Sequence, residues 1–293
     1  MIILLGSTGY VGSTFAKYFN QNKIDYTPAS ARFPLNVQKF QEAIIRTGAR
    51  AVFNCAGFAG SPNVDSCELA ENKVPTLQAN ALLPKQIARV CSDLGVQLVH
   101  ISSGCIYTDP QCDNARPPFI QFDESSISNF GFNTSKCSWY SGTKALGEDL
   151  IRNSNNTLIT RLRIPFNGDV SPRNYISKLI NYNVLLNSAN SFSNLDEYVK
   201  GTYDLYDNGH CGIFNLTQPG YLNTKEVVEI LKKYSLVRDK SYFKDIEAFE
   251  KITVAPRSNC VLNSSKALRC GIKLTHVVQS FEQAAFDYSR HVQ

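Results

Sequence analysis

The sequence predicts an α/β fold: a doubly wound parallel sheet with helices on both faces and a smaller C-terminal substrate lobe. In the first half of the 293-residue chain, short apolar runs alternate with stretches of helical periodicity, which is typical of a helix-flanked parallel sheet. After Pro165 this alternation weakens, and proline, asparagine and aromatic residues become more frequent. We therefore expect a domain over residues 1–164 and, over residues 165–293, mainly a lobe interleaved with the end of the sheet.

The period of the apolar residues assigns the individual elements. Short buried or alternating runs predict strands at residues 2–5, 51–55, 96–102 and 158–164. Amphipathic stretches predict helices at residues 11–22, 74–94, 141–152, 174–182, 224–234 and 276–288. Ligands of such sheets bind beyond the carboxyl ends of the strands, so we expect the C-terminal lobe to cover that edge.

Composition and charge limit the class of protein. The chain is 43% hydrophobic and 19% charged, with a net charge of +5 spread along the sequence. Scattered basic residues do not predict a nucleic-acid partner, and no apolar run is long enough for a membrane-spanning helix. The nine cysteines are odd in number and form no C-x-x-C pair, which predicts a reducing, cytoplasmic setting without a metal site.

A glycine-rich segment follows the first predicted strand and opens a helix. It reads Gly6-Ser7-Thr8-Gly9-Tyr10-Val11-Gly12. In this pattern the first glycine permits a tight turn, the second lets the backbone approach a pyrophosphate, and the third allows close helix packing. The helix N-terminus adds free N–H groups and a partial positive charge. The segment therefore predicts a Rossmann-type dinucleotide site.

Residues 28–32, where the second strand of such a sheet is expected to end, favour NADP(H) over NAD. A NAD-preferring site places an acid there, whereas this chain has Ser30 and Arg32. Arg32 either pairs with the ribose 2′-phosphate or is a solvated loop cation. Further cofactor contacts are expected from Asn36, at the adenine pocket, and from Asn54, Cys55, Ala56 and Gly57 at the end of another strand.

Three polar residues match the needs of carbonyl reduction. Tyr140 and Lys144 are one helical turn apart on one face, and Ser103 ends a predicted strand. We expect the Lys144 ammonium to lower the pKa of the Tyr140 phenol. Ser103 would then donate a hydrogen bond to the substrate carbonyl oxygen while Tyr140 protonates it.

These motifs resemble those of extended short-chain dehydrogenases. More narrowly, the chain is similar to dTDP-4-dehydrorhamnose reductases and to the UDP-rhamnose synthases, which combine 3,5-epimerase and 4-reductase activities. The narrower resemblance rests on the segments Pro62-Asn63-Val64-Asp65, Ser103-Gly104-Cys105-Ile106-Tyr107, Arg161-Leu162-Arg163-Ile164-Pro165, Pro172-Arg173-Asn174-Tyr175-Ile176 and Ala255-Pro256-Arg257-Ser258-Asn259. It implies conversion of UDP-4-keto-6-deoxy-D-glucose to UDP-L-rhamnose with NADPH by a homodimer. Two alternatives stay open: a reductase alone, and a non-catalytic NADP-binding regulatory subunit.

A second proton-transfer pair is expected for the epimerisation. Cys105 lies two residues beyond Ser103, on the same side of an extended chain. A thiol there can remove a proton acidified by the sugar ketone. The similar GDP-fucose synthases use a Cys and a His, but this chain has no His in the matching stretch, so Lys178 is the expected partner. Cys105 is otherwise a small buried residue, and Lys178 a solvated one.

Substrate contacts are expected from five further residues. Arg257 is the first candidate for the diphosphate and Arg173 the second, because a guanidinium binds phosphate through two parallel hydrogen bonds. Surface charge is the alternative for both. Amide contacts to sugar or base are expected from Asn167 and Asn259, with Asn174 on the helix face of Lys178; turn or cap chemistry is the alternative. Asp65 and Glu68 are expected to cap the helix that follows them.

Overall fold

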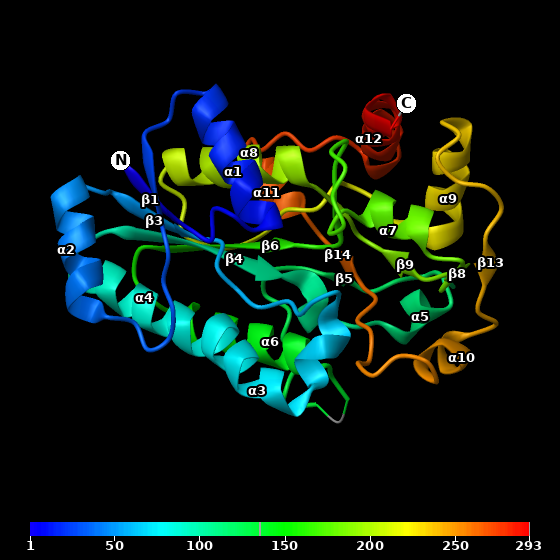
Figure 1. Cartoon of the computed structure of the whole chain (residues 1–293), viewed down its shortest axis with the longest axis horizontal. Coiled ribbons are helices and arrows are strands. Elements are labelled where there is room, and N and C mark those ends of the chain that lie inside the picture. Colours follow the sequence, from blue (N-terminus) through cyan, green and yellow to red (C-terminus); the bar gives the residue numbers. More distant parts are fainter. Residues whose placement is uncertain (135, 293) are drawn as a thin grey trace.

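Six parallel strands form the centre of the fold (Figure 1). The computed structural model describes residues 1–134 and 136–292. The strand order is β11-β6-β4-β3-β1-β2. The order of the strands reverses at β1, and in such sheets the ligand crevice lies beyond the carboxyl ends of the two strands at this point, β1 and β3. The strands are β1 (Ile2–Leu5), β2 (Tyr26–Ala29), β3 (Ala51–Asn54), β4 (Gln97–Ser103), β6 (Thr157–Leu162) and β11 (Gly212–Asn215). The predicted doubly wound sheet is confirmed.

Helices cover both faces of this sheet because successive strand residues point to opposite sides. On β1, Leu4 packs with Phe15 in one apolar cluster, whereas Ile3 packs with Ile44 in another. Figure 1 shows the two layers of helices above and below the sheet. The upper layer has α1 (Tyr10–Gln21) and α8 (Leu195–Asp207), and the lower has α2 (Val37–Thr47), α4 (Leu83–Asp93) and α6 (Trp139–Ile151).

The helix predicted over residues 74–94 is longer and interrupted. It runs as α3 (Ala70–Leu77), a π-helical turn η2 (Gln78–Leu82) and α4. Helix α6 packs closely against the π turn at Gly147, where a Cβ would overlap the backbone carbonyl oxygen of Asn80. The absence of a side chain at this position therefore sets how near the helix that bears Tyr140 lies to its neighbour.

The C-terminal lobe has its own aromatic core. Phe166 and Phe281 stack with ring centroids 3.8 Å apart, and Phe192 meets Phe281 edge-on. The lobe is built on α7 (Tyr175–Asn181), α9 (Thr224–Lys233) and α12 (Val277–Val292). However, β11 belongs to the main sheet and α8 packs on it. A boundary between residues 164 and 165 stays a prediction.

Short elements connect these layers and carry much of the site. The 3₁₀ turns are η1 (Val64–Glu68) and η3 (Gly104–Ile106), and the short helices are α5 (Pro110–Asp113), α10 (Ile246–Glu250) and α11 (Ser265–Arg269). Two-residue strands are β5 (Gln121–Phe122), β7 (Pro165–Phe166), β8 (Val184–Leu185), β9 (Ala189–Asn190), β10 (Ser193–Asn194), β12 (Leu222–Asn223), β13 (Ser241–Tyr242) and β14 (Val261–Leu262).

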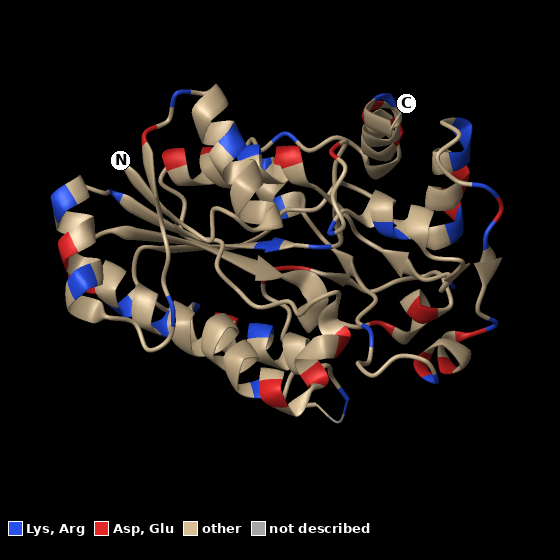
Figure 2. Ribbon diagram, viewed as in Figure 1, with Lys and Arg blue, Asp and Glu red and all other residues tan. Residues whose placement is uncertain are grey.

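The strand predicted at residues 158–164 ends early for a local reason. Strand β6 stops at Leu162, because Ile164 adopts a left-handed φ of 35° and Pro165 has no N–H for a ladder. Helices α2 and α8 and strand β11 have no counterpart in the predicted elements. Figure 2 shows acidic and basic residues intermixed on helices of both layers. Within the described residues, no helix is long and apolar enough to cross a membrane.

Candidate active site

The glycine loop after β1 requires two of its three glycines for packing. Gly6 has a φ of +73°, and a Cβ there would lie 2.7 Å from the backbone nitrogen of Ala56. A Cβ on Gly12 would overlap the carbonyl oxygen of Gly6. A Cβ on Gly9 would instead meet only one atom, the Gly6 oxygen, at an uncrowded 3.4 Å. The loop is thus tightly packed at Gly6 and Gly12 and has free space beside Gly9.

The free space beside Gly9 fits a pyrophosphate. Gly9 is the N-cap of α1 and offers no side-chain hydrogen bond to the helix, whose first turn contains no acid. The amides of that turn are therefore available to an anion. Ser7 and Val11 are half-buried beside the loop and Thr8 is exposed. The Tyr10 hydroxyl donates to Asn167 Oδ1 at 3.2 Å, which ties the loop to the C-terminal lobe.

The other predicted cofactor residues divide into exposed and structural ones. Ser30 and Arg32 are exposed just beyond the end of β2, and β2 pairs with β1 along its length. Asn36 accepts the Lys39 amide at 3.0 Å and is the N-cap of α2. Asn54 is fully buried.

Asn54 and its neighbours form the floor of the crevice. The Asn54 side chain bonds to His100 Nδ1 at 3.1 Å and accepts the Ala56 amide at 3.1 Å. Cys55 and Ala56 are half-buried, and Gly57 is exposed. Asn54 therefore holds the backbone of residues 55–56, against which the Gly6 loop packs.

Strand β4 and helix α6 bring the predicted reduction trio together. Ser103 ends β4 and its hydroxyl accepts the Cys105 amide at 3.2 Å. Lys144 is buried between the two elements and donates from Nζ to the Ile101 carbonyl at 2.9 Å. Tyr140 lies in the first turn of α6 and is partly buried against the cluster that contains Cys105. The trio residues thus occupy one end of one strand and its neighbouring helix.

Burial dominates the electrostatics of Tyr140. Desolvation raises the pKa of the phenol, and Cys105 and Cys67 raise it further. The Ser103 hydroxyl, through a hydrogen bond, and the charge of Arg163 lower this pKa. Lys144 was expected to have that effect, but in this structure Ser103 and Arg163 are the groups that lower the pKa.

The start of helix α6 is held by side chains of two segments. Ser138 caps it by accepting the Ser141 amide at 3.0 Å, and Glu68 accepts the Trp139 amide at 2.6 Å. Glu68 was expected to cap the helix after it; it binds α6 instead, because the turn η1 lies beside that helix. This anchoring sets the position of Tyr140.

Lys178 belongs to a cationic group on the substrate lobe. Burial lowers the pKa of Lys178, and the charges of Arg173 and Arg257 lower it further. A lysine with a lowered pKa exchanges protons more readily near neutral pH, which is the property that the predicted epimerase role needs. Its pairing with Cys105 stays a prediction.

Both predicted diphosphate arginines contact the segment before α3. Arg257 binds Asp65 with two hydrogen bonds of 2.7 and 2.9 Å, and Arg173 donates to the Gly60 carbonyl at 2.5 Å. Asp65 was expected to be a helix cap; Asn63 caps the turn η1 instead, and Asp65 is an ion-pair partner. The hydrogen bonds outweigh burial and hold the pKa of Asp65 below its usual value.

The three asparagines predicted at the substrate have another role. Asn167, Asn174 and Asn259 are all buried. Asn174 caps α7 through the Ile176 amide at 3.0 Å and donates to the carbonyl of Asn167 at 2.8 Å. Asn259 donates to Asp113 Oδ1 at 2.8 Å. Their side chains hold loops of the lobe together, because buried amides need internal partners.

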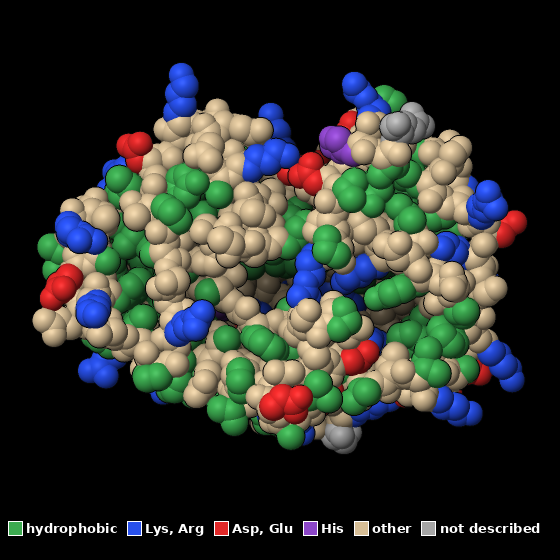
Figure 3. Space-filling view, viewed as in Figure 1, with side chains coloured by type: hydrophobic (Ala, Val, Ile, Leu, Met, Phe, Trp, Pro, Cys, Tyr) green, Lys and Arg blue, Asp and Glu red, His purple; other side chains and the backbone are tan. Residues whose placement is uncertain are grey.

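Two arginines at the end of β6, Arg161 within the strand and Arg163 directly after it, add charge that sequence reasoning did not assign. Arg161 is buried and binds Glu148, whereas Arg163 is buried beside Gly104. Their only sequence signal was the matching segment Arg161-Leu162-Arg163. Figure 3 shows a hollow on one face of the molecule in which Lys and Arg side chains gather.

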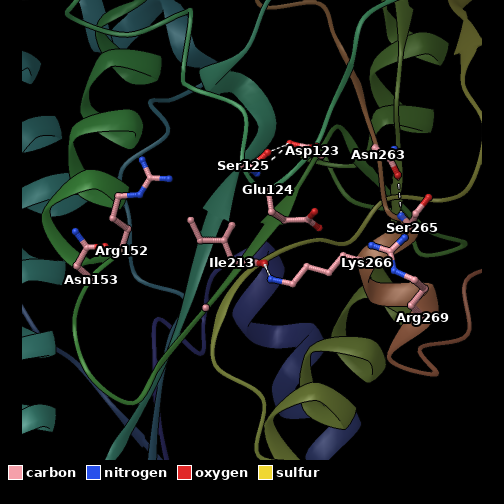
Figure 4. Close-up of a pocket in the computed structure, with 11 residues that line it drawn as sticks. Asp123, Glu124, Ser125, Arg152, Asn153, Ile213, Asn263, Ser265, Lys266 and Arg269 are labelled. Carbon is pink, nitrogen blue, oxygen red and sulfur yellow. Dashed lines mark hydrogen bonds between the residues drawn. The ribbon is translucent and has the colours of Figure 1, made fainter.

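A pocket of about 620 Å³ lies elsewhere, at the edge strand β11 (Figure 4). Lys266 donates to the Ile213 carbonyl at 2.7 Å, and Glu124 accepts the Asn215 amide at 2.8 Å. These bonds occupy backbone groups of an edge strand that would otherwise be free to pair with another chain. None of the predicted site residues lines this pocket.

The comparisons with known proteins agree with this geometry. The family model described as RmlD substrate binding domain matches residues 1–188. A bifunctional dTDP-4-dehydrorhamnose 3,5-epimerase/dTDP-4-dehydrorhamnose reductase of Arabidopsis thaliana is 33% identical over 270 residues, 90% of this chain and 85% of that protein. A trifunctional UDP-glucose 4,6-dehydratase/3,5-epimerase/reductase of the same plant is 31% identical, and its match covers 97% of this chain but only 41% of the longer protein.

Solved structures share the fold over the whole chain. The UDP-rhamnose synthase of Acanthamoeba polyphaga mimivirus superposes with a TM-score of 0.88 at 22% identity, covering 98% of each chain. A dTDP-4-dehydrorhamnose reductase of Bacillus anthracis, solved in complex with NADP, superposes with a TM-score of 0.77 at 16% identity, covering 99% of this chain and 98% of its own.

Proposed function

Since the chain belongs to the RmlD substrate-binding-domain family of nucleotide-sugar reductases, we propose that it converts UDP-4-keto-6-deoxy-D-glucose to UDP-L-rhamnose. The conversion has two stages, epimerisation at carbons 3 and 5 and then reduction at carbon 4 with NADPH. Reduction of a 4-keto sugar and 3,5-epimerisation are both among the activities named for the two Arabidopsis relatives. The epimerase stage and the uridine base are the finer parts of the proposal.

One observation carries the proposal: Ser103, Cys105 and Tyr140 meet at the end of β4 beside the buried Lys144. Carbonyl reduction needs a hydrogen-bond donor and a proton donor at one oxygen. Epimerisation needs a base at the adjacent carbon. The thiol, the phenol and the hydroxyl supply these groups within one small cluster.

Chemistry sets the order of the two stages. The 4-ketone acidifies the hydrogens on carbons 3 and 5, so Cys105 removes a proton while the ketone is intact and Lys178 returns one from the other face. Once carbon 4 is an alcohol, that acidity is lost. NADPH bound at the Gly6–Gly12 loop would supply the hydride. Tyr140 then protonates the oxygen, Ser103 orients it, and Lys144 holds the ribose side of the site.

The decisive experiment follows deuterium from solvent into the sugar. Wild-type protein with the un-epimerised keto sugar and NADPH in deuterated water should give rhamnose product labelled at carbons 3 and 5. Cys105→Ala should lose the label but still reduce a pre-epimerised keto sugar. Cys260→Ala is the matched control, because Cys260 is a second buried thiol of the same cluster.

The outcomes separate the alternatives. Unlabelled substrate returned by wild-type protein, together with reduction of the pre-epimerised sugar, would identify a reductase alone. Label at the wild-type rate in Cys105→Ala would remove Cys105 from the mechanism. No oxidation of NADPH with UDP-, dTDP- or GDP-linked keto sugars would leave a nucleotide-binding scaffold.

Assembly and setting belong to the same proposal. We propose a homodimer working in the cytoplasm, where the nine thiols, all free in this structure, stay reduced. Light scattering of purified protein at micromolar concentration tests the dimer, and a mass of one chain would contradict it.

A further inference from the structure

We propose that Arg163 supplies the fixed positive charge that stabilises the oxyanion formed at carbon 4 of the sugar in both stages. The inference rests on the proposed function. It adds Arg163 to Ser103 and Tyr140 as a group that stabilises the negative charge on the reacting oxygen. Its support comes from how Arg163 is held, from the absence of an acidic partner, and from where its side chain lies.

The local chain conformation places Arg163 rigidly. It follows the end of β6, where its amide donates to Ser193 Oγ at 3.0 Å. Its Nε and Nη2 atoms donate to Asn190 Oδ1 at 3.2 and 2.5 Å, and Nη2 also donates to the Ser258 carbonyl. The residue is only 7% exposed. The guanidinium is thus fixed by Asn190 and Ser258, and the backbone of Arg163 is held by Ser193.

Arg163 forms no direct ion pair within residues 1–134 and 136–292, and Asp113 is linked to it only through the side chains of Asn259 and Asn190. The hydrogen-bond acceptors of the guanidinium are an amide and a carbonyl oxygen, both uncharged. Arg161, two residues earlier, is equally buried but pairs with Glu148, with Nη2 and Oε1 2.5 Å apart. A buried charge is costly unless it is compensated. The chain therefore keeps one buried arginine neutralised and leaves its neighbour as a net cation.

The aliphatic part of the Arg163 side chain packs beside the catalytic segment, and its charge acts on Tyr140. Gly104 separates Ser103 from Cys105, and a Cβ on Gly104 would be 3.5 Å from Cδ of Arg163. The same charge lowers the pKa of Tyr140, against the larger effect of burial and those of Cys105 and Cys67. Within the described residues, the third nitrogen, Nη1, makes no hydrogen bond, so the donors on this nitrogen are not used by the lobe that holds Nε and Nη2.

Both stages create negative charge on one oxygen. When Cys105 takes the proton, the C–H electron pair forms a C=C bond and the carbonyl π pair moves to oxygen, giving an enolate. When hydride adds to carbon 4, the π pair again moves to oxygen, and Tyr140 then donates its proton. Arg163 gains and loses no atoms in either step. A fixed cation in a site of low dielectric lowers the energy of both anions.

Two variants test this from opposite directions. Arg163→Met removes the charge but keeps much of the volume, and Asn190→Asp keeps the arginine but gives it an acidic partner at the atom it already binds. We expect Arg163→Met to slow deuterium exchange and single-turnover hydride transfer alike, by about 10²–10³-fold, as for loss of one oxyanion donor. Asn190→Asp should slow both in the same sense, and Arg163→Lys should recover most of each rate.

The controls exclude a structural explanation. NADPH affinity, measured by fluorescence, should stay close to wild type in Asn190→Asp and Arg163→Lys. Asn190 Nδ2 also donates to Asn259 Oδ1 at 3.0 Å, and the aspartate loses this bond, so Asn190→Leu, which loses it without adding a charge, is the matched control. Equal rates of both stages in Asn190→Asp and Asn190→Leu would overturn the proposal even if Arg163→Met fails to fold. Failure of the proposed function is distinct, since wild-type protein itself would then neither exchange deuterium nor oxidise NADPH.

Discussion

At the level of single residues, several groups change the pKa of the Tyr140 phenol in opposite directions. Burial in the cluster around Cys105 raises the pKa of the phenol, and the Ser103 hydroxyl and the Arg163 charge lower it. A phenol that keeps its proton is suited to giving it to an oxyanion. Lys144 is anchored on the Ile101 carbonyl, in line with a role in holding the ribose.

Replacement of this phenol should separate the two stages. Tyr140→Phe should reduce the rate of NADPH oxidation by about 10²–10⁴-fold, the usual effect of losing a proton donor. Deuterium exchange should continue within a few fold of wild type, because Cys105 and Lys178 remain. Both rates are measured on one preparation by NADPH absorbance and mass spectrometry. An equal fall in both would mean that Tyr140 also takes part in epimerisation.

At the element scale, the unit β1–loop–α1 assigns different tasks to its glycines. Gly12 lets the helix pack on the loop, since a Cβ would overlap the Gly6 carbonyl oxygen. Gly9 is exposed and nearly free of neighbours, so its lack of a side chain serves a ligand and not the fold.

Two alanine variants should therefore behave differently. Gly12→Ala should lower the melting temperature by several degrees, because forcing atoms into a packed contact costs about 1–3 kcal/mol. Gly9→Ala should leave the melting temperature of the free protein within about two degrees of wild type yet weaken NADPH binding tenfold or more. Calorimetry and fluorescence titration give the two quantities. Equal NADPH affinity in Gly9→Ala and wild-type protein would place the pyrophosphate elsewhere.

At the scale of the whole molecule, the central strand β4 links stability to pH. His100 on this strand is buried. Desolvation and the charge of Lys144 hold the pKa of His100 well below its usual 6.5. The folded protein therefore keeps the imidazole neutral, whereas the unfolded chain binds a proton below about pH 6.5. This contribution to stability is complete above that pH and is lost as the pH falls toward the folded-state pKa.

The free energy of unfolding should record this proton. Between pH 6 and 5 the wild-type protein should lose up to about 1.4 kcal/mol per pH unit more than His100→Asn, which has no imidazole to titrate. Urea unfolding at pH 7.5, 6.5, 6.0 and 5.0 supplies the comparison. Parallel pH dependences in the two proteins would show that His100 is not responsible.

Local sequence patterns were enough to predict the doubly wound sheet, the glycine loop and the grouping of Ser103, Tyr140 and Lys144. Each depends on local information: apolar period, the spacing of glycines after a strand, and two side chains one helical turn apart. The spacing from Ser103 and the chemistry of a thiol predict Cys105 as the epimerase base, and residues that match a known pattern identify the family.

Which polar side chains are free to bind a ligand depends on contacts between distant segments. Arg257 forms an ion pair with Asp65, 192 residues away in the chain. The asparagines at positions 167, 174 and 259 are buried among internal partners. Arg163 is buried beside Gly104 and forms no direct ion pair. Burial and charge pairing arise between segments distant in the chain, so no local spacing encodes them. They nevertheless set the energy of every charge at the site, since an ion's cost depends on what surrounds it.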